Sequence, residues 1–177
     1  MDQWGPLLEG CKKNDRTSQE RLYKRLYPAL YNLCKKFFRD DHEILTALNS
    51  GMLKVFSNIG SYDEKKGSFF NWAYTIVRNS ALSQLKAGRD EPVFEELDDH
   101  HAASLYEQAF AESGWEEKFA YLDVLPPVTR AVCSLFYLED FPVKDIAETL
   151  SIKEGTVKWH LNECRTRLRK LFNKNNP

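Results

Sequence analysis

The sequence predicts an all-α protein in which two helical domains are joined by a linker. Apolar residues recur at the spacing of a helix face almost throughout the chain, and the alternating pattern of strands is nearly absent. Only 8 of the 177 residues are glycine and 42% are hydrophobic, so the chain can bury one large core or two small ones. An acidic segment that contains Pro92 separates the two helical halves.

Three helices are expected in the first half. They cover residues 18 to about 38, about 41 to 59, and about 69 to 86, where Ser68 caps the third helix. A turn-rich stretch at residues 60–67 precedes that cap. The residues expected to face the core are Leu22, Leu26, Leu30, Leu33 and Phe37 in the first helix, and Leu45, Leu48, Met52, Val55 and Phe56 in the second.

The second half contains four expected elements after Gly114. One of them is a helix that opens at Leu125-Pro126-Pro127 and runs to about Tyr137. The expected division is therefore a first domain at residues 1–87, an acidic linker at 88–113 and a second domain at 114–177.

Residues 142–171 are typical of a helix-turn-helix. Pro142 suits the first turn of a helix, and Ile146, Ala147 and Leu150 form its apolar face. The run from Ser151 to Glu154 has the form of a capping box for the next helix. That helix is expected to bury Val157, Leu161, Cys164 and Leu168, with small Ala147 at the close crossing of the two helices.

The opposite face of this helix favours DNA binding. Lysine and asparagine donate to base edges, glutamate accepts from cytosine, and arginines along the helix end suit phosphates. From residue 151 onward, seven basic residues face two acidic ones, a formal charge of 7 − 2 = +5. The formal net charge of −1 hides this asymmetry, because eleven acidic residues lie between Asp90 and Asp123. The candidate contacts are Lys153, Gly155, Thr156, Lys158, Trp159, Asn162, Glu163, Arg165, Arg167 and Arg169.

The third helix and the loop before it combine aromatic rings with cations and amides. Rings stack on unpaired bases and cations meet the backbone, so this pattern is typical of single-stranded nucleic-acid binding. An amide can also read the edge of a base that has left the stack. Burial in a core helix remains the alternative reading for the aromatic residues. The candidates are Tyr62, Lys65, Lys66, Ser68, Trp72, Arg78, Asn79 and Lys86.

Taken together, these segments resemble a small two-domain sigma factor of bacterial RNA polymerase, of the extracytoplasmic-function (ECF) type in the sigma-70 family. The resemblance covers most of the chain outside the linker and rests on RLYKRLYPALYNLCKKFF at residues 21–38, on residues 48–86, and on residues 122–172. It implies that the first domain opens the promoter −10 element by capturing a flipped base. It also implies that the second domain reads the −35 duplex and that the linker enters the polymerase cleft.

The same resemblance implies partners rather than a cofactor. RNA polymerase core would bind through its β′ clamp helices, promoter DNA would be the second partner, and an anti-sigma protein could sequester the chain. The polymerase-binding residues would be Leu45, Asn49, Met52 and Lys54. The chain departs from the family pattern at Leu45 and Thr46, where acids are usual, and also at Ser50, Ser83 and Glu163.

Two other classes of function share some of these sequence features. A stand-alone helix-turn-helix regulator, with a sensing or dimerising first half, would bind duplex DNA unaided. An enzyme is disfavoured, because the four histidines lack metal-ligand spacing and no phosphate loop or nucleophile motif occurs. The four cysteines form no CxxC pair, and no long apolar run occurs, so a cytoplasmic protein without membrane insertion, metal or cofactor is expected.

Overall fold

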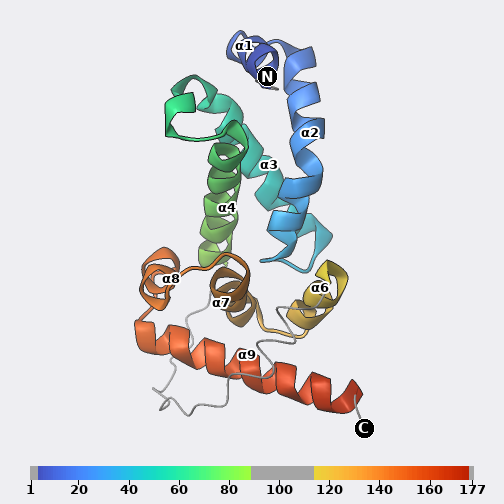
Figure 1. The fold of residues 1–177 in the computed structure, drawn as a ribbon, viewed down its shortest axis with the longest axis vertical. Helices are drawn as coiled ribbons and strands as arrows, with labels where there is room; N and C mark the ends of the chain where they lie inside the picture. Colours follow the sequence, from blue (N-terminus) through green and yellow to red (C-terminus); the bar gives the residue numbers. More distant parts are fainter. Residues whose placement is uncertain (1–3, 89–113, 176–177) are drawn as a thin grey trace. The chain divides into compact units, whose positions relative to one another are not determined.

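The computed structural model describes residues 4–88 and 114–175, and within them every regular element is a helix (Figure 1). The expected all-α fold class is confirmed. The chain divides into two compact units, Met1–Gln84 and Leu85–Pro177. The α-helices are α1 (Gly5–Lys12), α2 (Arg16–Lys35), α3 (Asp41–Ser57), α4 (Phe69–Ala87), α6 (Trp115–Asp123), α7 (Pro127–Leu138), α8 (Val143–Leu150) and α9 (Glu154–Asn175). Apart from its first residue, the linker expected at 88–113 lies outside the described residues.

The helix α1 is an addition to the helices expected from the sequence. It ends at Lys12, and Asn14, two residues later, has a φ of 58° and leads the chain into α2. Asp15 then caps α2, because its carboxylate accepts a hydrogen bond from the Ser18 amide at 2.8 Å. The two helices approach so closely that a Cβ at Gly10 would lie 2.1 Å from the Ser18 hydroxyl. This position therefore requires glycine.

The core of the first unit follows the expected stripes closely, with one correction in α3. All five residues of the first expected stripe are buried, although α2 ends at Lys35 and Phe37 lies in the turn after it. In α3, Leu48, Met52 and Val55 are buried, whereas Phe56 is only half-buried. Leu45 was expected to face the core as well, and this is wrong: 36% of its surface is exposed. The preceding residue, Ile44, is buried in its place. The buried face of α3 is therefore shifted by one residue at this end of the helix.

The helix α4 begins as expected. The Ser68 hydroxyl accepts from the Asn71 amide at 3.3 Å, which satisfies one of the free donors of the first turn. α4 packs tightly on α3, since a Cβ at Gly51 would lie 2.8 Å from the Val77 Cα atom. Two short 3₁₀-helices, Ile59–Ser61 and Glu64–Lys66, shape the loop between α3 and α4.

The second unit is built around α7 and α9. Its core cluster draws on α6, α7 and α9 and consists of Phe119, Leu122, Leu125, Cys133, Cys164 and Leu168. On α8, Ile146, Ala147 and Leu150 are buried, as expected for the first helix of a helix-turn-helix. Pro142 stands at the N-cap, so the helix begins one residue later than expected.

The turn between α8 and α9 differs from the expected capping box. Ser151 adopts the left-handed conformation, with a φ of 54°, and its amide donates to the Glu148 carbonyl. The Ile152 amide donates to the Ala147 carbonyl at 3.0 Å. This pair of bonds is a Schellman motif, which closes the end of α8. The capping box is therefore wrong: Ser151 ends the first helix and does not begin the second, which starts at Glu154.

Candidate nucleic-acid interface

The helix α9 buries one face and turns the other to solvent. Its expected apolar stripe is confirmed, because Val157, Leu161, Cys164 and Leu168 are all buried. The thiols of Cys133 on α7 and Cys164 lie 2.8 Å apart inside this core, and both are free. Their proximity results from the packing of α7 on α9, and no motif in the sequence predicts it. The buried stripe fixes which residues of α9 remain available for a ligand.

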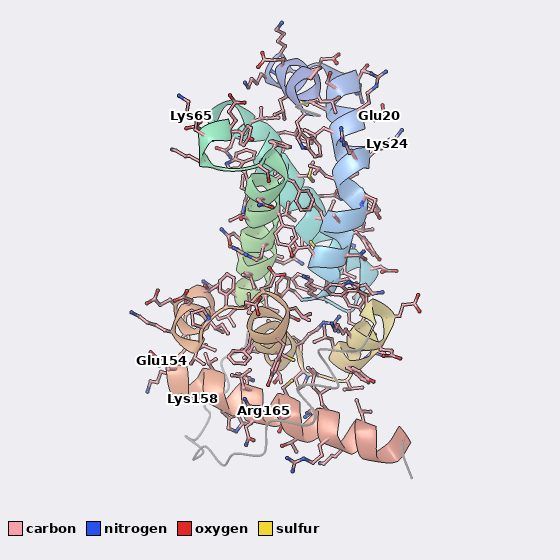
Figure 2. The ribbon with its side chains drawn as sticks, viewed as in Figure 1. Glu20, Lys24, Lys65, Glu154, Lys158 and Arg165 are labelled. Carbon is pink, nitrogen blue, oxygen red and sulfur yellow. The ribbon has the colours of Figure 1, made fainter. Side chains whose placement is uncertain are left out.

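The expected DNA-contacting residues of α9 differ in exposure. Lys153, Lys158 and Asn162 are exposed, and Lys158 and Asn162 lie one turn apart on the same face. Figure 2 shows Lys158 and Arg165 at two points along the helix. The remaining expected residues are half-buried: Gly155, Thr156, Trp159, Glu163, Arg165, Arg167 and Arg169. The exposed pair is therefore the most accessible part of this surface.

Two arginines of α9 already hold contacts within the second unit. The Arg167 Nε atom donates to the Glu163 carboxylate at 2.5 Å, and its Nη1 atom donates to the Val124 carbonyl at 3.5 Å. Arg165 donates through Nε to the Tyr137 hydroxyl at 3.2 Å. A guanidinium has five N–H donors, and each of the bonds named here uses one of them. The internal contacts orient the side chains before any ligand binds.

The loop between α3 and α4 rests on a cluster of aromatic rings. Phe69 lies 5.2 Å from Tyr62, 5.6 Å from Trp72 and 5.5 Å from Trp4, measured between ring centroids. The Tyr62 hydroxyl donates to the Gly67 carbonyl at 3.0 Å, which closes the loop. Gly67 has a φ of 143°, a conformation that favours glycine. The loop is thereby held in one shape.

The outer side of this loop carries the expected polar residues. Lys65, Lys66 and Ser68 are exposed, and Figure 2 places Lys65 at the outer edge of the loop. Asp63 shapes the turn, because its carboxylate accepts from the Lys65 amide at 3.0 Å. The two lysines are accessible to a phosphate backbone, although Asp63 and the exposed Glu64 balance their charge within the same loop.

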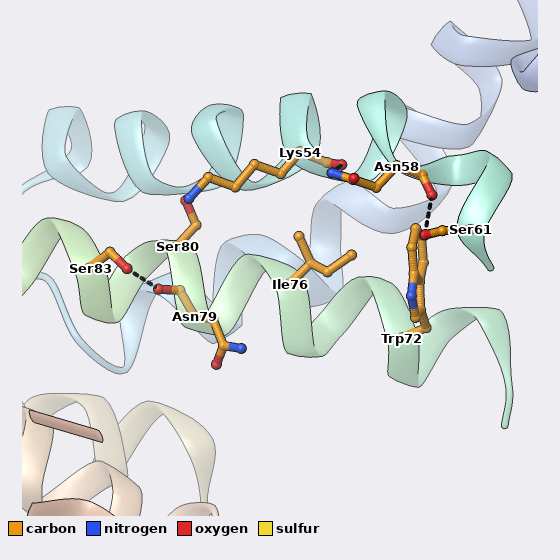
Figure 3. A pocket seen from close by; sticks show the side chains of 8 residues that line it. All are labelled: Lys54, Asn58, Ser61, Trp72, Ile76, Asn79, Ser80 and Ser83. Atoms are coloured by element: carbon orange, nitrogen blue, oxygen red, sulfur yellow. Dashed lines mark hydrogen bonds between the residues drawn. The ribbon is translucent and has the colours of Figure 1, made fainter. Parts of the chain in front are cut away.

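Beside this loop, α3 and α4 enclose an open pocket of about 340 Å³ (Figure 3). Trp72 forms one wall, and Asn79 lies two turns further along α4. In Figure 3 the Lys54 side chain extends across the pocket toward Ser80. The full lining is Lys54, Asn58, Ser61, Trp72, Ile76, Asn79, Ser80 and Ser83. Trp72, Asn79 and Lys54 thus line the same hollow, although the Asn79 amide points away from α3 and from the Lys54 ammonium (Figure 3).

The aromatic residues of α4 divide between the core and the pocket. Phe69 is buried in the core, whereas Trp72 is half-buried, with one side on Phe69 and another in the pocket wall. Asn79 is exposed, and Arg78 and Lys86 are half-buried. Trp72 and Asn79 therefore belong to the lining of one pocket, whereas Arg78 and Lys86 do not.

The expected polymerase-binding residues do not form one surface. Leu45 and Asn49 are exposed on α3, but Met52 retains only 2% of its surface and belongs to the core. A surface role for Met52 does not fit this burial. Lys54 is exposed but lines the pocket. The residue missed on this face is Leu53, which is 67% exposed and follows Leu45 and Asn49 at a spacing of four. That spacing is the signal that could have found it.

The described residues contain neither a cluster of metal ligands nor a membrane-spanning helix. Among the described residues, no three His, Cys, Asp or Glu side chains gather as a metal site would require. Within the same ranges, the helices lack the combination of length and apolar character needed to cross a membrane.

Comparison with known proteins identifies the two units. The sequence model of Sigma-70 region 2 matches residues 22–90, and that of Sigma-70, region 4 matches residues 120–168. The chain belongs to the sigma-70 family. The region 2 match covers the pocket and the exposed face of α3, and the region 4 match covers the helix-turn-helix. A stand-alone regulator with a sensing first half does not account for the region 2 match.

The relatives of this sigma factor are ECF sigma factors. It is 24% identical to the ECF RNA polymerase sigma factor SigW of Bacillus subtilis over 175 residues, 92% of this chain and 93% of SigW. It is 22% identical to SigM of the same organism over 160 residues, 88% of this chain and 95% of SigM. It is 26% identical to SigM of Mycobacterium tuberculosis over 166 residues, 94% of this chain and 83% of that relative. This sigma factor is a DNA-binding initiation factor of the ECF type, which acts with RNA polymerase core at promoters.

Proposed function

We propose that the first unit captures an unpaired base of the −10 element in the pocket between α3 and α4. The supporting observation is that Trp72 and Asn79 line the same pocket. An aromatic face stacks on any base, and an amide donates to and accepts from its pairing edge. The volume of about 340 Å³ falls within the range of small-ligand sites.

The residues around the pocket serve the backbone of the same strand in this proposal. Lys65, Lys66 and Ser68 on the loop contact phosphates on one side, and Arg78 and Lys86 contact them along α4. Lys54, which the resemblance would assign to polymerase, joins this group because it crosses the pocket. Tyr62 holds the loop in shape through its bond to Gly67.

The second unit reads the −35 duplex through α9 in this proposal. Lys158 and Asn162 reach base edges, because they are exposed on the face opposite the buried stripe. The half-buried Trp159 and Glu163 flank them. Lys153, Arg165, Arg167 and Arg169 meet phosphates, which orients the helix in the groove without reading sequence.

The exposed face of α3 binds the β′ clamp helices of polymerase core in this proposal. Leu45, Asn49 and Leu53 form one stripe there, with an amide between two exposed leucines. Exposed leucines at fixed spacing are typical of a surface that a partner covers. An anti-sigma protein that occupied this stripe would exclude polymerase. The proposal gives the chain domains at 1–87 and 114–177, and it assigns no catalytic residue or cofactor.

The decisive experiment is the substitution Asn79→Ala in the full chain. Holoenzyme carrying it should open the promoter more slowly, with a loss of roughly 1–3 kcal/mol that corresponds to the unstacked and recognised base. Opening is measured by 2-aminopurine fluorescence in the −10 element. Binding to a −35 duplex and affinity for core polymerase should not change.

A matched control is Asn32→Ala, which removes the same side chain from an exposed position on α2 outside the pocket. It should open the promoter at the normal rate. Equal damage by both variants, or equal loss of −35 binding with Asn79→Ala, would contradict the assignment of the pocket to the flipped base.

A further inference from the structure

Three tyrosines on α2 form a continuous row beside α3. We call Tyr23, Tyr27 and Tyr31 the tyrosine ladder; its ring centroids are 5.8 Å and 5.6 Å apart. All three side chains are half-buried. Both ends of the ladder are bonded to α3: the Tyr31 hydroxyl donates to Asp41 Oδ1 at 2.7 Å, and the Tyr23 hydroxyl donates to Asn49 Oδ1 at 2.8 Å. The ladder therefore ties the two helices together over two turns.

The two hydrogen bonds fix the register of α2 against α3. Eight residues separate the two bonded tyrosines, and eight also separate Asp41 from Asn49, in the opposite chain direction. In this antiparallel register Tyr27 lies level with Leu45. The ladder thus runs alongside the stripe of Leu45, Asn49 and Leu53 that the proposed function assigns to polymerase.

The Tyr23 bond decides what Asn49 presents to a partner. Its carbonyl oxygen is occupied by the tyrosine hydroxyl, so the amide nitrogen, with two N–H donors, is the free end of the side chain. The hydroxyl is protonated near neutral pH and can donate, and burial raises the pKa of Tyr23 further above its usual value. Without this bond the amide could rotate, and either end could face outward.

We propose that Tyr23 is a positioning residue that sets Asn49 as a hydrogen-bond donor between Leu45 and Leu53. The partner groove then needs an acceptor flanked by apolar surface. Such a contact requires no acidic pair on this helix, which fits the presence of Leu45 and Thr46 where acids are usual in the family. This inference rests on the proposed role of the α3 stripe in binding polymerase.

Two matched variants test it. Tyr23→Phe and Tyr31→Phe each remove one hydroxyl and one bond to α3 and leave the ring stack in place. Tyr23→Phe should weaken core-polymerase affinity by about threefold to tenfold, the worth of one hydrogen bond. Tyr31→Phe should leave the affinity unchanged. Affinity is measured by titration of labelled full-length protein with core, and thermal unfolding checks that both variants fold.

Asn49→Ala and the double variant Tyr23→Phe/Asn49→Ala separate this inference from the proposed function. Asn49→Ala alone should weaken binding, and adding Tyr23→Phe should weaken it no further, because the tyrosine acts only through the amide. Asn49→Asp keeps an acceptor for Tyr23 but loses the outward donor, so it should bind as weakly as the alanine variant.

Each contrary result has a distinct meaning. Normal binding by Asn49→Ala overturns the polymerase surface and the inference with it. Weak binding by Asn49→Ala with normal binding by Tyr23→Phe overturns the positioning role alone. Equal losses with Tyr23→Phe and Tyr31→Phe also overturn it, since the ladder would then act only by holding α2 on α3.

Discussion

Individual side chains of α9 fall into two groups, according to whether they already hold a partner in their own unit. Lys158 and Asn162 project to solvent, whereas Arg165 and Arg167 are oriented by Tyr137 and Glu163. The Glu163–Arg167 pair is partly exposed, so it adds little to stability, but it fixes the direction of both side chains. A side chain that reads bases must be able to adjust to a base edge. Lys158 and Asn162 fit that requirement better than Arg165 and Arg167 do.

Asn162→Ala should therefore relax the base preference at one position of the −35 element. The loss of one bidentate contact is worth about 1–3 kcal/mol on the preferred sequence and much less on others. Selection of bound sequences from randomised −35 duplexes by holoenzyme measures this. Lys153→Ala is the contrasting variant: a phosphate contact should weaken all sequences alike and reduce the salt slope by about one. An unchanged motif for Asn162→Ala would show that this side chain does not face the bases.

Three helices among the described residues end at or near a non-glycine residue with positive φ. Asn14, Asp140 and Ser151 all have positive φ values, between 54° and 58°, at or just after the ends of α1, α7 and α8. Such a conformation costs an L-residue roughly 1–2 kcal/mol, and glycine avoids this cost. Asparagine and aspartate tolerate the conformation better than serine does. The turn of the helix-turn-helix thus carries strain at Ser151.

Ser151→Gly should stabilise the second unit. The relief of strain exceeds the added entropy of an unfolded glycine, which leaves a gain of roughly 0.5 kcal/mol. Thermal unfolding of the full chain measures the change in melting temperature. Hydrogen exchange of the amides of the second unit shows whether the gain lies there. Ser68→Gly is the matched control, since the Ser68 hydroxyl caps α4; it should cost a few tenths of a kcal/mol. A lower melting temperature for Ser151→Gly would show that the hydroxyl matters more than the strain.

Features that depend only on neighbouring residues could be predicted from the sequence, whereas those that depend on packing could not. The long helices carry stripes such as Leu22 to Leu33, and a local period suffices to find them. Ser68 was predicted as a cap because its role depends only on the next three residues. Ser151 was misread, since the same serine can open one helix or close another, and the choice depends on how α8 packs on α9. The helix α1 carries two glycines in eight residues, which weaken its helical signal.

The candidate site was predictable in its residue types but not in its grouping. Trp72 and Asn79 could be named from α4 alone, because aromatic and amide side chains on one helix suggest base binding. Lys54 enters the pocket only because Gly51 lets α3 approach α4 closely. The bond from Tyr23 to Asn49 likewise depends on the register of two helices 26 residues apart in sequence. No local pattern encodes such distances.

At the scale of the whole molecule, function is divided between the two units, and charge is distributed unevenly along the chain. The formal net charge is −1, yet the segment from residue 151 onward carries +5 by count. The two DNA surfaces also differ in kind: a pocket for one unpaired base in the first unit, and an exposed helix face for duplex in the second. Each surface rests on the buried residues of its own unit, so each can be altered without unfolding the other.

This division predicts additive losses on a full promoter. Asn79→Ala and Asn162→Ala share no partner, so their free-energy losses in open-complex formation should add within about 0.5 kcal/mol in the double variant. The measurement is the equilibrium between closed and open complexes for the four proteins of the cycle, on one promoter at one salt concentration. On a promoter with a scrambled −35 element the Asn162→Ala loss should vanish, whereas the Asn79→Ala loss should remain. A double variant that lost much less than the sum would mean that −35 reading and base capture are coupled through the polymerase, so that failure of one already abolishes the benefit of the other.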